Sequence, residues 1–192
     1  AWKQLAESIG ASFSESQNEQ LKGVSRVRSL EKILEWSGIS LSESEFESLM
    51  EQKNNEYLQY ISKMDRDEIL PDVERLIAYV KGQGSLIALG SASKNARTIL
   101  QKVQLFDHFN AIVDGTNVTK AKPDPEVFLL AASQLDRSPE DCVVFEDAVA
   151  GVQAANAAGM VSIGIGSQEV LHEADYVFAD FTEISNEFLS NL

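Results

Sequence analysis

Residues 142–159 read CVVFEDAVAGVQAANAAG, and they decide which fold class the chain can adopt. The run Cys142–Phe145 is short and apolar, as is typical of a strand that helices cover on both faces of a parallel sheet. Glu146 and Asp147 follow this run, and a stretch of small residues with helical character then ends at Gly159. Ligands of open parallel sheets bind at the carboxyl ends of the strands. The stretch therefore predicts a strand–helix unit with two acids at its turn.

The two acids at this turn allow two interpretations. Adjacent carboxylates in a partly buried place repel each other, and a bound Mg²⁺ removes that cost because hard cations prefer oxygen ligands. Alternatively, Glu146 and Asp147 only complement the positive end of the helix that follows them. The residues at the other strand ends must decide between a metal site and a simple helix start.

The composition limits the classes of partner. The chain has 16 Lys and Arg against 30 Asp and Glu, a formal charge of −14, and no run rich in Lys or Arg. We therefore expect no nucleic-acid or anionic-membrane partner, whereas an anionic small molecule remains a candidate if the few cations gather at one site. The single cysteine, Cys142, excludes an internal disulfide and suits a reducing compartment, so we expect a cytoplasmic protein. We also expect a monomer.

The first third of the chain, residues 1–68, has the apolar spacing of helices and no strand pattern. Ser42 and Glu45 have the spacing of a capping box, which predicts that a long helix begins there. Lys53 interrupts the apolar stripe of that helix. This lysine either extends along the edge of the stripe to reach water or directs its charge into a cleft, and the spacing leaves both possibilities open.

From residue 69 onward, short apolar runs alternate with helical stretches. This pattern predicts a parallel sheet with helices on both faces, and therefore an α/β fold. The expected strands are residues 85–90, 111–115, 142–145, 161–166 and 176–180, and a last helix is expected from residue 182. We predict two domains, a small α-helical one of residues 1–68 and an α/β one of residues 69–192.

Two further polar clusters follow expected strands. Residues 91–95, SASKN, offer hydroxyls and backbone N–H groups that could cradle a phosphate, although a plain helix N-cap explains them as well. Lys122 precedes Pro123 at a helix entry, where it is either an ordinary surface lysine or a fixed cation for a phosphoryl group. With Glu146 and Asp147 these clusters supply the parts that phosphoryl transfer needs.

One part of that chemistry is not visible in the sequence. No residue close to the three clusters is an obvious nucleophile or general acid. His108 and His172 fall in loop-like regions away from them, and Asp114 ends a strand but is followed by GTN. The site therefore requires a carboxylate that these residues do not show.

Ser91, Lys122 and the Glu146–Asp147 pair, with the segments KPDPEVF and EDAVAGVQAANAAGM, resemble motifs two, three and four of the haloacid dehalogenase (HAD) superfamily. The helical first third, with NEQLKGVSRVRSLEKIL and EQKNNEY, is similar to the cap of the β-phosphoglucomutases within that superfamily. The resemblance implies a Rossmann-like HAD core with a parallel sheet flanked by helices, plus a small α-helical cap.

The resemblance also implies a role for each matching position. Ser91, Lys122 and the backbone of Ala92 would hold the transferring phosphoryl group, and Glu146 and Asp147 would bind Mg²⁺ as the cofactor. The residues implied at the distal phosphate are Arg26, Ser93, Lys94 and Asn95. Those implied beside the sugar are Lys22, Gly23, Val24, Ser29 and Lys53. Arginine suits phosphate because its planar fork can bind two oxygens.

The reaction implied is the interconversion of β-D-glucose 1-phosphate and β-D-glucose 6-phosphate through an aspartyl-phosphate enzyme and β-glucose 1,6-bisphosphate. The family carries its nucleophile and its acid/base in an Asp-x-Asp-Gly strand, and this chain starts after that point, within the first cap helix. We therefore expect a fragment of a longer protein, inactive in transfer by itself. The alternatives are a sugar-phosphate phosphatase of the same superfamily and a non-catalytic protein that binds a phosphosugar or Mg²⁺.

Overall fold

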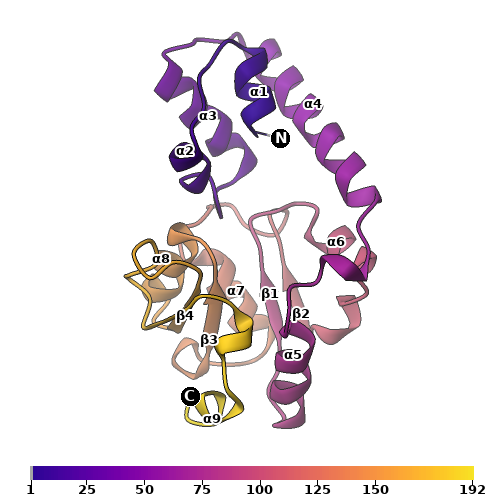
Figure 1. Ribbon diagram of the computed structural model, residues 1–192, viewed down its shortest axis with the longest axis vertical. Coiled ribbons are helices and arrows are strands. Elements are labelled where there is room, and N and C mark those ends of the chain that lie inside the picture. Colours follow the sequence, from indigo (N-terminus) through magenta and orange to yellow (C-terminus); the bar gives the residue numbers. More distant parts are fainter. Residues whose placement is uncertain (1) are drawn as a thin grey trace.

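The computed structural model describes residues 2–192. Helices make up the N-terminal part, and strands alternate with helices after it, so the molecule has an upper helical part and a lower α/β part (Figure 1). We refer to residues 2–68 as the cap and to residues 69–192 as the core. This boundary follows directly after a 3₁₀ turn, η1 (Arg66–Glu68), and the division into two domains stays a prediction.

The cap is built from four helices around a small apolar centre. They are α1 (Trp2–Ser8), α2 (Glu15–Glu19), α3 (Arg26–Ser37) and α4 (Glu43–Ser62). The capping box expected at Ser42 and Glu45 is confirmed, with the Glu45 N–H donating to the Ser42 hydroxyl and the Ser42 N–H to the Glu45 carboxylate. Buried Leu21 and Ile33 lie at the centre of the cap. The long helix α4 runs down one side of the molecule to reach the core at α6 (Figure 1).

The core has the predicted α/β pattern of strands and helices. Its elements are α5 (Val73–Gly82), β1 (Ala88–Gly90), α6 (Ala96–Lys102), η2 (Phe106–His108), β2 (Ala111–Val113), α7 (Glu126–Gln134), η3 (Pro139–Asp141), β3 (Val143–Glu146), α8 (Val149–Ala157), β4 (Val161–Ile165), β5 (Tyr176–Phe178), η4 (Phe181–Glu183) and α9 (Asn186–Leu189). The expected stop at Gly159 is confirmed by its left-handed φ of 75°. Among residues 2–192, no helix is long and apolar enough to cross a bilayer.

All strand pairs are parallel, as predicted, but they form two groups. β1 pairs with β2, and β3 pairs with β4, which pairs with β5. Each of β1 and β3 therefore has one edge that faces no strand of residues 2–192. β1 also starts later than expected, at Ala88 instead of Ser85, because ladder pairing with β2 begins only at Ala111.

The C-terminal helix also differs from the prediction. Instead of one helix from Thr182, a 3₁₀ turn is followed by the short α9. Two separate caps divide the segment: the Asp180 carboxylate accepts the Thr182 N–H, and the Ser185 hydroxyl accepts the Phe188 N–H. Each cap starts a new turn, so the backbone cannot continue as one helix.

Helix α7 joins the two strand groups on one face of the core. Val127 and Phe128 of this helix pack in one cluster with Val113 of β2 and Val144 of β3. On the other face, α5 and α6 cover β1 and β2 through a second cluster of buried apolar side chains, among them Ile77 of α5, Leu100 of α6 and Ile112 of β2. Helix α7 thus connects the two strand groups, while α5 and α6 cover only the β1–β2 group.

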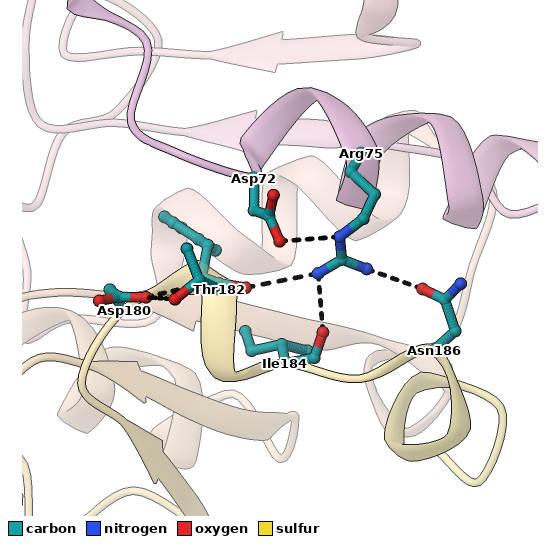
Figure 2. Close-up of polar contacts among 7 residues, drawn as sticks. Asp72, Arg75, Asp180, Thr182, Ile184 and Asn186 are labelled. Carbon is teal, nitrogen blue, oxygen red and sulfur yellow. Dashed lines mark hydrogen bonds and ion pairs between the residues drawn. The ribbon is translucent and has the colours of Figure 1, made fainter.

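The hydrogen bonds of one arginine side chain also connect the two strand groups. Arg75 of α5 donates to the Asp72 carboxylate at 2.9 Å, to the Asn186 side chain at 2.7 Å and to the Ile184 carbonyl at 2.7 Å (Figure 2). Because α5 precedes β1 and Ile184 follows β5, this guanidinium connects segments that belong to different strand groups.

Candidate active site between the cap and the strand ends

One cavity of about 1370 Å³ contains most of the site residues that were predicted from the sequence. It extends from the cap helices past the carboxyl ends of β1 and β3 and then between these strands. The predicted site residues that line it are Gly23, Val24, Arg26, Lys53, Ser91, Ala92, Ser93, Lys94, Asn95, Lys122, Glu146 and Asp147. The structure therefore brings residues from the cap and from three strand ends to one place.

Two predicted site residues do not line this cavity. The Ser29 side chain is fully buried in the cap, and its hydroxyl donates to the Ser25 carbonyl at 2.9 Å. Lys22 forms an ion pair with Glu19 at 2.7 Å and borders a smaller cavity of about 360 Å³. Neither residue lines the larger cavity in this conformation, although Asp147 lines both cavities.

The lysine of the second cluster lies at the core end of the cavity. Lys122 Nζ donates to the Gly90 carbonyl at 3.1 Å and forms an ion pair with Glu146, and it lies 4.5 Å from the centre of the Phe128 ring. The two charged side chains are only 6% and 10% exposed. Lys122 is therefore a buried, fixed cation that links the end of β1 to the end of β3, and the surface-lysine alternative is excluded.

The two acids of the opening stretch differ in their surroundings. Glu146 ends β3 and is largely buried, and its second carboxylate oxygen accepts the Asp147 N–H at 3.0 Å, whereas the Asp147 side chain is exposed. Carboxylate oxygens at a strand end suit a hard cation such as Mg²⁺. Within residues 2–192, however, no three His, Cys, Asp or Glu residues are grouped as a metal site requires. The pair fits part of a ligand set, which water, a phosphate or further protein oxygens would complete.

The loop 91–95 forms two consecutive serine turns. The Ser93 N–H donates to the Ser91 hydroxyl and the Asn95 N–H to the Ser93 hydroxyl, both at 3.1 Å, while the Ser91 N–H donates to the last carbonyl of β2 at 2.9 Å. In the part of the chain that the structure describes, the N–H groups of Ala92 and Lys94 have no protein acceptor. These two groups are thus available to an anion in the cavity.

The cap end of the cavity holds two cations without acidic partners. Lys53 Nζ lies 4.7 Å from the centre of the Trp2 ring and 4.6 Å from that of Tyr57, and Arg26 starts helix α3 close by. Burial, and then the charge of Arg26, lower the pKa of Lys53. Among residues 2–192, no carboxylate lies within 4 Å of either cation. Lys53 therefore lines the cavity with its ammonium group beside two aromatic rings, and a bound anion would offset its repulsion with Arg26.

The cap touches the core on both sides of this cavity. A Cβ atom added to Gly23 would lie only 2.9 Å from Cβ of Ala148, so the cap loop rests directly on the start of α8. On the other side, the Asn95 amide donates to the Asn54 side chain at 3.3 Å. The cap thus contacts the core on both sides of the cavity.

Several residues of the site were not predicted from the sequence. Phe128 lies beneath Lys122, and Trp2 and Tyr57 flank Lys53. Tyr57 could have been found, because residues four apart face each other on a helix. Gly115 also belongs here, since a Cβ on it would lie 2.5 Å from the Ala92 carbonyl oxygen. It holds the 91–95 loop close to the end of β2.

The chain matches the model of the family described as "haloacid dehalogenase-like hydrolase" over residues 1–159. The chain belongs to this family. The HAD resemblance of the sequence motifs is therefore confirmed, and so is the fold class, a Rossmann-type HAD core with parallel strands flanked by helices.

The relatives include mutases and phosphatases. The chain is 42% identical to a β-phosphoglucomutase of Bacillus subtilis over 98% of this chain and 84% of that protein. It superposes on a crystal structure of β-phosphoglucomutase from Clostridium difficile with a TM-score of 0.93 and 38% identity, over 99% and 86% of the two chains. A phosphorylated carbohydrates phosphatase of Thermotoga maritima is 29% identical over 85% of this chain and 74% of that protein. This homology supports an enzyme of the isomerase or phosphotransferase type.

Proposed function

We propose that this chain provides the cap and most of the core of a β-phosphoglucomutase, which interconverts β-D-glucose 1-phosphate and β-D-glucose 6-phosphate. The observation that carries the proposal is the presence of cations at both ends of one cavity, Lys122 at the core end and Arg26 with Lys53 at the cap end. A mutase must hold a phosphate at each end of its bisphosphate intermediate, whereas a phosphatase needs only one phosphate site. The near full-length similarity to the Bacillus subtilis enzyme supports the same reaction.

The chain's own residues would divide the work between the two ends. At the core end, the Ser91 hydroxyl, the Ala92 N–H and the Lys122 ammonium group would hold the oxygens of the transferring phosphoryl group, where negative charge builds up in the transition state. Glu146 and Asp147 would hold Mg²⁺, which when bound neutralises phosphoryl oxygens. The residues proposed for the distal phosphate are Arg26, Ser93, Lys94 and Asn95. Those proposed for the sugar side are Gly23, Val24 and Lys53, whereas Lys22 and Ser29, which the resemblance implied there, do not line the cavity in this conformation.

The nucleophile of the proposed reaction would be an aspartate carried by a strand between β1 and β3. Both strands have an edge toward the cavity that lies between them, and apolar side chains such as Leu89 and Phe145 line that space. A strand inserted there would satisfy the backbone groups of both edges. Its carboxyl end would reach the space beside Lys122 and Glu146. We expect residues 1–192 without such a strand to be inactive in transfer.

The proposal is tested with the full natural chain, β-glucose 1-phosphate, Mg²⁺ and a trace of β-glucose 1,6-bisphosphate. We expect glucose 6-phosphate to form, and its absence under these conditions would contradict the proposal. A small-molecule hexose phosphate is then the partner, while the monomeric state and the cytoplasmic location stay predictions from the sequence.

A phosphatase acting on a sugar phosphate is the second candidate, because relatives such as the Thermotoga maritima enzyme carry that name. The variant Arg26→Ala separates the two functions. A mutase should lose about 100-fold in kcat/KM, since truncation of a charged phosphate contact costs about 2–5 kcal/mol. A phosphatase should keep most of its hydrolysis of a small phosphate ester. Calorimetry with glucose 6-phosphate and Mg²⁺ tests the third candidate, a protein that binds these ligands without turnover.

A further inference from the structure

We propose that Gly151 is a positioning residue, whose missing side chain sets the place of the Glu146 carboxylate. A Cβ atom added to Gly151 would lie 1.9 Å from Oε1 of Glu146, 2.1 Å from its Cδ and 2.6 Å from its Cγ. Real Cβ atoms do not approach other heavy atoms this closely. Any side chain at position 151 therefore forces the carboxylate to a different place.

The backbone gives no other reason for a glycine at this position. Gly151 lies in the first turn of α8, its N–H donates to the Ala148 carbonyl at 3.0 Å, and its φ is negative, so alanine could adopt the same conformation. Glycine is among the weakest helix formers, so it weakens the helix here. The glycine instead leaves space for the Glu146 carboxylate, which occupies the position that a Cβ atom of residue 151 would take.

A displaced carboxylate cannot keep its present contacts. One oxygen of Glu146 is paired with Lys122, and the other accepts the Asp147 N–H at 3.0 Å. The Glu146 backbone is fixed in β3 by pairing with Gly164 of β4. The side chain must therefore rotate away, which separates it from Lys122 and removes one of the two carboxylates proposed for Mg²⁺. This last consequence rests on the proposed function.

The test compares Gly151→Ala with Gly82→Ala in the full natural chain. Gly82 ends helix α5, and a Cβ added there would meet nothing within 4 Å, so this control adds the same methyl group to a helix without a contact. We expect Gly82→Ala to keep the parental affinity for Mg²⁺. Gly151→Ala should weaken it by about 10- to 100-fold, the usual effect of disturbing the support of a metal ligand. Calorimetric titration with MgCl₂ measures both.

Rescue by a shorter acid separates positioning from a general loss of structure. In Gly151→Ala/Glu146→Asp, the carboxylate is withdrawn by one methylene, so Mg²⁺ affinity should recover relative to Gly151→Ala alone. Equal affinity of the parent and Gly151→Ala would overturn the proposal, as would an unmoved Glu146 side chain in the crystal structure of the variant. If the parent does not bind Mg²⁺, the proposed function fails. The inference about Gly151 is then tested by the crystal structure of Gly151→Ala alone, which should show the Glu146 carboxylate displaced from Lys122.

A stability cycle keeps the inference testable if Gly151→Ala folds poorly. Glu146→Ala removes the group that the new methyl would meet. We expect Gly151→Ala to lower the midpoint of urea unfolding in the parent, and to leave it equal or raise it in the Glu146→Ala background, where only the better helix former remains. A similar loss in both backgrounds would contradict the proposal, since the obstacle would then not be the carboxylate.

Discussion

The two ends of the cavity hold their cations in opposite ways. At the core end, Lys122 is buried with a carboxylate and a carbonyl as partners. At the cap end, burial and then the charge of nearby Arg26 lower the pKa of Lys53, which has aromatic rings and, among residues 2–192, no carboxylate within 4 Å of its ammonium group. Lys122 therefore has a carboxylate partner before any ligand binds, whereas Arg26 and Lys53 have none within 4 Å among residues 2–192, so a bound anion can offset their mutual repulsion. Phosphate binding should cost the core end an ion pair and relieve repulsion at the cap end.

The largest expected effect comes from breaking the core-end pair. Lys122→Met leaves Glu146 buried without its partner, which should lower the free energy of unfolding by about 3–5 kcal/mol. Phosphoryl transfer should fall by about 100-fold or more, because a fixed donor to the developing charge is lost. Urea unfolding and glucose 6-phosphate formation measure the two effects.

The matched control for this variant lies two residues away. Lys120 is 71% exposed and contacts only Asp124 as an ion pair, so Lys120→Met should change stability by about 0.5 kcal/mol or less. Equal stability of the two variants would show that the core-end pair is not a buried, coupled pair.

The next largest effect is expected where the cap loop at Gly23 contacts the start of α8 in the core. Gly23 and Gly38 have the same left-handed φ, 69° and 67°, but only Gly23 lies against a neighbour, Ala148. Alanine at either position should cost about 1–2 kcal/mol in backbone strain. Only Gly23→Ala should also hold the cap away from α8 and raise KM for the sugar phosphate about tenfold, which corresponds to about 1.4 kcal/mol. Steady-state kinetics of both variants would contradict this if KM rose equally.

A fourth cation, Arg75, lies outside the cavity and shows how much a hydrogen-bonded charge contributes to stability alone. Arg75→Ala removes the Arg75 contacts that Figure 2 shows and should lower the free energy of unfolding by about 1–2 kcal/mol. KM and kcat should stay unchanged, because this side chain does not line the cavity. The control Arg66→Ala loses only an exposed pair with Glu74 and should cost about 0.5 kcal/mol. A change in KM for Arg75→Ala would mean that the Arg75 contacts shape the cavity.

The smallest expected effect is a gain in stability, from a substitution of Lys53. Burial lowers the pKa of Lys53 in the folded state, so its charged form destabilises the fold at every pH below that pKa. Lys53→Met should therefore raise the midpoint of urea unfolding near pH 7 while weakening sugar-phosphate binding. The gain should shrink as the pH rises through the folded pKa toward the unfolded one, because the lysine then loses its proton in the native state. Unfolding curves across that alkaline range measure the trend.

The fold was largely readable from the sequence because its signals are local. The alternation of apolar runs and helical stretches, the capping box at Ser42 and the glycine stop at Gly159 each depend on neighbouring residues, and the structure confirms them. The separation of the strands into two groups does not follow from periodicity, since apolar runs do not state which strands pair. The division of the C-terminal segment was missed because two competing caps, Asp180 and Ser185, look alike in sequence.

The candidate site was predictable in its chemistry and less so in its geometry. Strand ends gather at one edge of a parallel sheet, so the order of strands and polar clusters along the chain was enough to group Ser91, Lys122 and Glu146. Ser29 and Lys22 were grouped with them through their place in LKGVSRVRS, but packing decides which side chains reach a cavity, and neither of these two lines the larger one. A helix sequence likewise does not reveal which side chain occupies the room above a glycine.

The placement of the cations has a consequence for the speed of association. The chain carries 16 positive and 30 negative side chains, and six of the positive ones line the cavity, at positions 26, 53, 94, 120, 122 and 137, against three acidic ones. A dianionic substrate is therefore repelled by the molecule at long range and attracted only near the opening. Salt screens charges beyond about 8–10 Å, so it should weaken the distant repulsion more than the attraction inside. Moderate salt should then accelerate substrate capture, the reverse of its effect on a protein whose outer surface is basic.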